Sequence, residues 1–192
     1  FSFLHRFLRE VKFKLILKNS KKTILSSQDS KNTLSKLYKT SLSKIQIVPF
    51  VSIIDNNDFK TSILADLKLI EGEYFLVSNQ FHKHKNFEVV LQAFSKLPKN
   101  TKLKLVITGG KSESNANYFN RIQQLSKSLK LKDRIVFTGF ISREDVISLM
   151  YYSLSLIQPS FFEGWNTAIE DCKSLGVNVI ASNIDVHKEQ LG

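Results

Sequence analysis

The 192-residue chain has few of the features that mark secreted and membrane-spanning proteins. Its single cysteine, Cys172, rules out an internal disulfide and makes a reducing compartment the default. No apolar run reaches the roughly 18 residues that a membrane span needs. The opening FSFLHRFLREVKF is no secretory signal, because charges interrupt its apolar residues and no small-residue cleavage site follows. We therefore expect neither a disulfide-stapled secreted domain nor a transmembrane helix in this stretch.

Two further absences concern the ends of the sequence. It has no initiator methionine and it stops at VHKEQLG without a closing element, so we interpret it as a piece of a longer protein. Its length suits one large domain or two partial ones. Since 42% of the residues are hydrophobic, the chain is able to bury a core, and we expect it to be folded.

Acidic residues are scarce at one end of the chain only. Residues 1–44 hold 11 Lys and Arg against 2 acidic residues, whereas residues 45–192 hold 17 against 15. The net charge of +11 therefore belongs mainly to the N-terminal quarter. Such a segment is compatible with nucleic acid, anionic lipid, an anionic substrate or simply a solvated face.

Residues 1–17 have the pattern of a basic amphipathic helix. Two interpretations stay open: the helix packs on its own domain, or it lies on an anionic membrane surface. We do not expect nucleic acid as a partner, because the aromatic residues follow a core-like helical stripe instead of a stacking platform and no known binding motif is present. The apolar positions at helical spacing are Phe3, Leu4, Phe7, Leu8, Val11 and Leu15.

Strand-like and helix-like segments alternate along the chain, most regularly from residue 71 onward. This alternation predicts βαβ units, and hence a Rossmann-like α/β fold with a parallel sheet and helices on both faces. Residues 51–70 have the mixed composition of a connector. We predict strands at 22–27, 44–51, 74–79, 102–110, 134–140, 153–160 and 177–182, and helices at about 28–38, 87–97, 116–131, 143–151 and 167–175. The expected N-caps are Ser27 or Asp29 for the helix at 28–38, Asn86 for that at 87–97, and Ser142, with Asp145 three residues on, for that at 143–151.

Ligands of parallel sheets bind beyond the carboxyl ends of the strands. Four predicted strand tips carry glycine or polar residues, and Gly109 and Gly110 lie in one of them. We therefore expect a ligand site where these loops meet. The loops are residues 78–86, 108–111, 138–142 and 159–167.

The stretch PSFFEGWNTAIEDCKSLG places an acid, a glycine and the lone tryptophan, Trp165, before a short helix. The free N–H groups at the start of that helix, around Thr167, suit an anion such as a diphosphate. Gly164 lets the backbone approach a ligand closely, and Asn166 is a candidate N-cap.

The three acids of this stretch differ in their expected direction. At about 100° per residue, Asp171 falls at the edge of the apolar face of the helix, whereas Glu170 points nearly opposite that face. A carboxylate placed like Asp171 is able to accept hydrogen bonds from vicinal hydroxyls such as those of a ribose. Glu163, near the helix start, is placed to bind a sugar ring. The alternative is that Glu163 and Glu170 only complement the helix dipole.

These residues resemble the acidic motif of the retaining glycosyltransferases of family 4, which have the GT-B architecture and use nucleotide-diphosphate sugars. That motif is a glutamate, seven residues and a second glutamate; here Glu163 and Asp171 have this spacing, with aspartate at the second position. The resemblance implies that Glu163 binds hydroxyls of the donor sugar and Asp171 those of the ribose.

Three other segments resemble the same family in the expected order. SNQFHKHKN is similar to its phosphate-binding loop, which implies that Lys85 contacts the donor pyrophosphate. Gln80 replaces a common arginine, for which Asn79 or the cluster at 82–84 is expected to compensate.

FTGFISREDVISLMYYS is similar to the family's segment around the nucleobase, which implies contacts from Phe140 and Ile141. KIQIVPFVS resembles the end of the family's acceptor domain.

The resemblance implies a two-domain enzyme of which this chain is part. Residues 1–66 are expected to be the end of a first, Rossmann-like acceptor domain with the linker, and residues 67–192 an incomplete nucleotide-sugar-binding domain. Glu163 and Lys85 are the expected catalytic residues. The expected donor-binding residues are Asn79, Gln80, Lys85, Gly109, Gly110, Phe140, Ile141, Glu163, Gly164, Trp165, Asn166, Thr167 and Asp171.

The implied reaction moves a hexose, with retention, from a UDP- or GDP-sugar to a saccharide or lipid-linked acceptor. We expect no further cofactor and no metal, because His82 and His84 alone are a weak metal signal. The expected setting is surface polysaccharide or glycolipid assembly in the cytoplasm, at the inner face of the membrane, and the isolated piece is expected to be inactive. The alternatives are a nucleic-acid-binding domain and a non-catalytic nucleotide-sugar-binding remnant.

Overall fold

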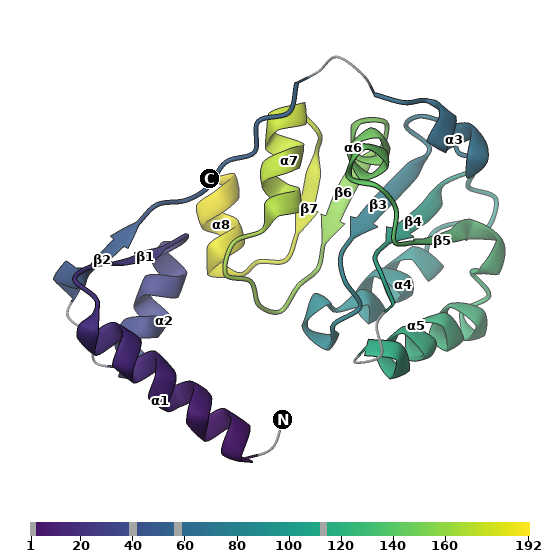
Figure 1. Cartoon of the computed structure of the whole chain (residues 1–192). Coiled ribbons are helices and arrows are strands. Elements are labelled where there is room, and N and C mark those ends of the chain that lie inside the picture. Colours follow the sequence, from purple (N-terminus) through teal and green to yellow (C-terminus); the bar gives the residue numbers. More distant parts are fainter. Residues whose placement is uncertain (1–2, 39–41, 56–58, 112–114) are drawn as a thin grey trace.

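The computed structural model describes residues 3–38, 42–55, 59–111 and 115–192. These residues form two parallel sheets (Figure 1). The smaller sheet pairs β1 (Thr23–Leu25) with β2 (Ile45–Ile47), and the larger has five strands in the order β5-β4-β3-β6-β7. The predicted α/β fold with a Rossmann-like parallel sheet is therefore confirmed. The strands of the larger sheet are β3 (Tyr74–Ser78), β4 (Lys104–Thr108), β5 (Ile135–Gly139), β6 (Ser155–Gln158) and β7 (Val179–Ala181).

Side chains of successive strand residues point to opposite faces of the larger sheet, and helices cover both faces. On one face Leu76, Val106 and Leu156 pack against α3 (Ser62–Asp66), α6 (Arg143–Tyr151) and α7 (Thr167–Leu175). On the other, Val77 and Leu105 pack against α4 (Phe87–Ser95) and α5 (Ala116–Ser128). Burial on both faces explains why the strands are nearly continuous apolar runs. The prediction of helices on both faces is confirmed.

Helix ends follow the predicted caps with one exception. The Ser142 hydroxyl accepts a hydrogen bond from the N–H of Asp145 at 3.1 Å, as expected at the start of α6. Ser27 caps α2 (Gln28–Tyr38) by accepting from the N–H of Ser30 at 3.0 Å. The prediction that the Asn86 side chain caps α4 is wrong, because that amide instead donates to the carbonyl of Pro159 at 3.1 Å. Asn86 thereby ties two loops together.

Two helices were absent from the sequence prediction. α3 lies in the segment interpreted as a connector, and α8 (Asp185–Leu191) follows β7. α8 packs on α2, and the Glu189 carboxylate accepts from the N–H of Gln28 at 2.8 Å. The segment VHKEQLG, for which no element was predicted, is therefore largely helical.

α1 (Phe3–Asn19) is the predicted basic amphipathic helix, and it lies clear of the larger sheet (Figure 1). Leu17 is its one buried residue. The apolar side chains on the rest of the helix are exposed, from Val11 at 38% to Phe3 at 87%. No helix in the described ranges is long and apolar enough to cross a membrane.

Candidate functional site

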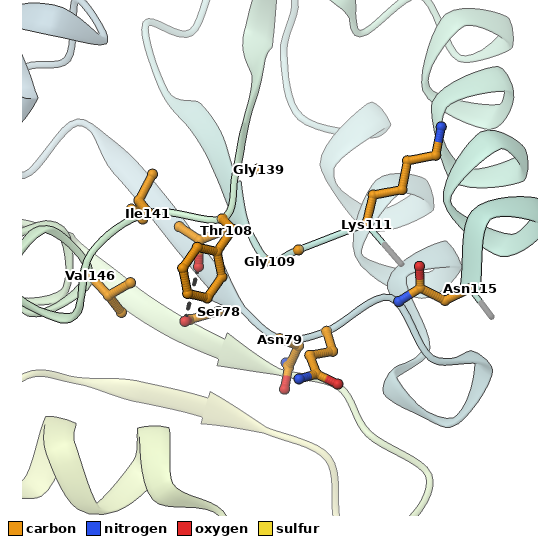
Figure 2. A pocket seen from close by; sticks show the side chains of 12 residues that line it. Ser78, Asn79, Thr108, Gly109, Lys111, Asn115, Gly139, Ile141 and Val146 are labelled. Carbon is orange, nitrogen blue, oxygen red and sulfur yellow. Dashed lines mark hydrogen bonds between the residues drawn. The ribbon is translucent and has the colours of Figure 1, made fainter. Parts of the chain in front are cut away.

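A cavity of about 350 Å³ opens at the carboxyl edge of the larger sheet, between the loops that follow β3, β4 and β5 (Figure 2). At this edge the pairing of β4 with β5 is irregular, so that Thr108 lies opposite Gly139. The Phe140 side chain is 89% exposed. The cavity combines that exposed ring with backbone and side-chain amides. The structure brings together six of the predicted residues here: Asn79, Gln80, Gly109, Gly110, Phe140 and Ile141.

The close packing of the strand tips that line the cavity requires a glycine at the end of β4. Gly109 has φ +149°, a backbone conformation that L side chains rarely adopt. A Cβ added to Gly109 lies 2.0 Å from the carbonyl oxygen of Asn79. The Gly109 N–H donates to the carbonyl of Gly139 at 3.0 Å, which joins the tips of β4 and β5. Any residue with a side chain at position 109 would therefore force the tips of β3 and β4 further apart.

The two predicted catalytic side chains form an ion pair on neighbouring loops. Lys85 ends the short 3₁₀ turn η2 (Lys83–Lys85) after β3, and its Nζ lies 2.5 Å from Oε1 of Glu163. The same oxygen accepts from the Ser160 hydroxyl at 2.7 Å and from the Asn166 amide at 3.2 Å. All hydrogen bonds found for this carboxylate in the described part of the chain go to Oε1. Oε2 is thus the oxygen available to a further donor.

Glu163 is 8% exposed and lines a hollow of about 280 Å³ between its own loop and the starts of α2 and α8. Asp29 and Asp185 line the same hollow. The Ser26 and Ser30 hydroxyls reach the carbonyl of Gly164 at 3.3 and 3.4 Å. The loop before α7 is therefore held from both the smaller sheet and the larger one.

Two histidines near the ion pair have a lowered pKa. Burial lowers the pKa of His84, and the neighbouring Lys85 lowers it further. Burial also lowers the pKa of His187, which lies on α8 with Nδ1 at 3.1 Å from the carbonyl of Ser182. Both rings are consequently neutral near pH 7. Among the described residues, no three His, Cys, Asp or Glu side chains gather in a metal-binding cluster.

The start of α7 presents fewer free N–H groups than the sequence suggests. Asn166 is the predicted N-cap, and its Oδ1 accepts from the N–H of Ile169 at 3.3 Å. The N–H of Asn166 itself donates to Gln190 of α8 at 3.1 Å, so it is already occupied. The indole N–H of Trp165 donates to the carbonyl of Phe50, the residue before the connector, at 2.9 Å.

Asp171 lies apart from the 350 Å³ cavity, in a separate hollow of about 290 Å³ beside the connector. Arg143 binds both of its oxygens, at 2.6 and 2.7 Å, and the Ser52 hydroxyl donates to one of them at 2.5 Å. The hydrogen bond to Asp171 raises the pKa of Arg143. A ribose at Asp171 thus has to displace Ser52 or Arg143. Sequence analysis did not single out Arg143, although it directly follows the cap of α6.

Glu170 does point away from the apolar face of α7, but it is not exposed. Its side chain is 3% exposed because α8 covers that side, and the Gln190 amide donates to Oε1 at 2.9 Å. Lys173 lies 3.6 Å from the same oxygen. The helical wheel of α7 predicted the direction of the Glu170 side chain correctly. It did not predict that α8 covers that side of the helix.

The fold and the acidic motif together define a glycosyltransferase of the GT-B architecture. Residues 60–192 match the family described as glycosyl transferases group 1, and the chain belongs to this family. The predicted membership of family 4 is confirmed.

Known relatives are similar along most of this chain. The O-antigen chain mannosyltransferase RfbU of Salmonella typhimurium is 26% identical over 96% of the chain, and the mannosyltransferase ALG2 of Debaryomyces hansenii is 32% identical over 59% of it. A glycosyltransferase structure from Rickettsia africae has a TM-score of 0.81 at 24% identity, covering 94% of this chain and 50% of that one. Anabaena HepE in complex with UDP and glucose has a TM-score of 0.82 at 17% identity, covering 94% and 49%. The chain spans 50% of RfbU and 28% of ALG2.

Proposed function

We propose that this chain binds a UDP- or GDP-sugar and takes part in transferring its hexose, with retention, to a saccharide or lipid-linked acceptor. The observation that carries the proposal is the ion pair of Lys85 and Glu163, which joins the loop that follows β3 to the loop between β6 and α7. Two of the named relatives are mannosyltransferases, so mannose is the first sugar to test. Cell-surface polysaccharide assembly is the corresponding setting.

Each part of the site has a role in this proposal. The nucleobase enters the cavity beside Phe140 and Ile141, where an exposed ring and backbone amides favour a flat heterocycle. The diphosphate lies against Lys85 and the N–H groups of Gly164 and Thr167. The Oε2 atom of Glu163 accepts from the sugar hydroxyls. Binding of HepE to UDP supports the donor class.

In this mechanism the chain stabilises the leaving group. When the anomeric C–O bond breaks, negative charge grows on the diphosphate, and a fixed cation and backbone dipoles lower the energy of that state. Lys85 supplies the cation, which makes a metal unnecessary in the proposal. Retention requires the acceptor hydroxyl to approach on the face that the diphosphate leaves. Glu163 fixes the sugar in that orientation by its hydroxyls.

Nucleotide binding by the chain is the direct test. At a hundredfold excess over the dissociation constant, a nucleoside diphosphate stabilises the folded state by about 2.7 kcal/mol, which raises the Tm by about 5–10 °C. We expect Phe140→Ala to lose most of this shift with UDP or GDP. Phe3→Ala is the matched control, since Phe3 and Phe140 are equally exposed at 87% and 89%. Equal shifts in both variants contradict the placement of the base.

The acceptor side of the proposal involves α1. Its exposed apolar stripe and basic residues suit the surface of an anionic membrane, where lipid-linked acceptors reside. We place the protein on the cytoplasmic face in this proposal. If α1 instead packs on further protein, we expect no binding of the chain to vesicles.

We expect Arg6→Glu combined with Arg9→Glu to lower binding to phosphatidylserine vesicles at least about tenfold, because each basic residue near such a surface contributes about 1 kcal/mol. Co-sedimentation measures the bound fraction. Lys99→Glu with Lys127→Glu makes the same change in net charge at exposed positions away from α1. A similar loss in both double variants points to overall charge and contradicts a role for α1.

A further inference from the structure

A cluster of buried polar side chains between α7 and α8 has no part in the mechanism above. Glu170 and Gln190 are each 3% exposed and Asn166 is 4% exposed. Burying a polar group costs free energy unless the group is hydrogen-bonded. Among the described residues, no fully buried side-chain nitrogen or oxygen of these three residues lacks a hydrogen-bond partner. The cluster lies close to the loop that carries Glu163.

Gln190 binds the backbone of the residue that caps α7. Its Oε1 accepts from the N–H of Asn166 at 3.1 Å, and its Nε2 donates to the carbonyl of the same residue at 3.1 Å. The Nε2 also donates to Oε1 of Glu170 at 2.9 Å. Because a carboxylate accepts hydrogen bonds only, Glu170 fixes which end of the Gln190 amide faces it.

Asn166 passes this constraint on to Glu163. The Oδ1 atom of Asn166 caps α7, so its Nδ2 faces the other way and donates to Oε1 of Glu163 at 3.2 Å. That oxygen also accepts from Lys85 and Ser160. With Oε1 held by three donors, Oε2 is left in one defined place.

We propose that Gln190, oriented by Glu170, is a positioning residue that holds Glu163 where it binds the donor sugar. The proposal rests on the proposed function, and it assigns a role to two side chains that do not touch the donor. In the natural chain the amide of Gln190 accepts one hydrogen bond and donates two, and the bond that orients it is the one between Gln190 and Glu170.

The decisive variant is Gln190→Glu. It keeps the shape of the side chain, removes both donors and places a second carboxylate against Glu170. The swap of Glu170→Gln with Gln190→Glu restores one donor and one carboxylate in the pair, and the carboxylate introduced at position 190 still accepts from the N–H of Asn166. Gln124→Glu, on the exposed side of α5, is the matched control for charge.

The first readout needs no ligand. In Gln190→Glu we expect the N–H of Asn166 and of Ile169 to exchange with solvent about tenfold faster, as measured by NMR, because the loss of a buried hydrogen bond loosens the cap. The swap is expected to bring the rates back to within about threefold, the range of a partly restored bond. Unchanged exchange in Gln190→Glu overturns the proposal.

The second readout separates sugar from nucleotide. We expect Gln190→Glu to lower the affinity for GDP-mannose or a UDP-hexose about tenfold more than it lowers the affinity for the free nucleoside diphosphate. We expect the swap to restore most of the lost affinity for the nucleotide sugar. Equal weakening of both ligands, or no recovery in the swap, means a merely structural role and overturns the proposal. If the natural chain binds no nucleotide, the proposed function fails, and the exchange result still decides the link from Gln190 to Asn166. Gln190→Met, which is uncharged, gives the same comparison should the carboxylate variant not fold.

Discussion

Replacing Lys85 with alanine is expected to lower the rate of sugar transfer by about 10²–10³-fold, the usual effect of removing one group that stabilises transition-state charge. Lys85 is 15% exposed in its side chain and is the cation nearest to Glu163 in the described structure. Its loss leaves the departing diphosphate without a fixed positive charge. The rate is measured as release of the nucleoside diphosphate from UDP- and GDP-sugars by the full-length protein.

Glu163→Ala is expected to lower the rate of transfer by a similar factor, through a different contact with the donor. It removes the hydrogen bonds to the sugar hydroxyls, so the affinity for a nucleotide sugar falls toward that of the free nucleotide. Lys99→Ala is the control for Lys85, because Lys99 is exposed and precedes β4 at the opposite edge of the sheet. Full activity in Lys85→Ala and Glu163→Ala excludes this pair from the mechanism.

The fold was predictable because its signals are local. Each strand of the larger sheet is a short apolar run, and each helix that covers it has an apolar stripe or a cap within a few residues. The Asn166 cap and the loop of Glu163 follow from the same short stretch. The parallel arrangement then brings the loops after β3, β4 and β5 to one edge, since parallel strands share their carboxyl end.

The partners of the acids were not predictable, because they come from distant segments. Asp171 meets Ser52, which is 119 positions away, and Arg143, which is 28 away. A helical wheel gives the direction of Asp171 but not what lies there. Glu170 is buried by α8, a helix of seven residues that is too short for a clear periodic signal.

The structure also changes what donor binding at Asp171 requires. Two charge-assisted hydrogen bonds from Arg143 are stronger than neutral ones, and the carboxylate is 2% exposed. A ribose offers only neutral hydroxyls in exchange. Displacement of Ser52, which belongs to the connector, leaves the pair with Arg143 intact and is the less costly route. Binding of the ribose is therefore coupled, in our proposal, to the position of the connector.

Gly109→Ala is expected to lower the free energy of unfolding by about 3 kcal/mol or more, and the Tm by about 6–12 °C. The added Cβ lies 2.0 Å from a backbone oxygen of Asn79, which no rotamer change relieves, and φ at +149° adds strain. Thermal unfolding followed by circular dichroism measures the change.

Gly110→Ala is the matched control, because it makes the same substitution one residue later. Its Cβ meets only the Phe140 side chain at 3.7 Å, an ordinary van der Waals contact, and Gly110 has no positive φ. We expect its Tm to stay within about 2 °C of the parent, as for most substitutions without a clash. The contrast tests the close approach of the β3 and β4 tips directly. Equal Tm values for the two variants contradict that approach, and with it the shape of the cavity in which we place the nucleobase.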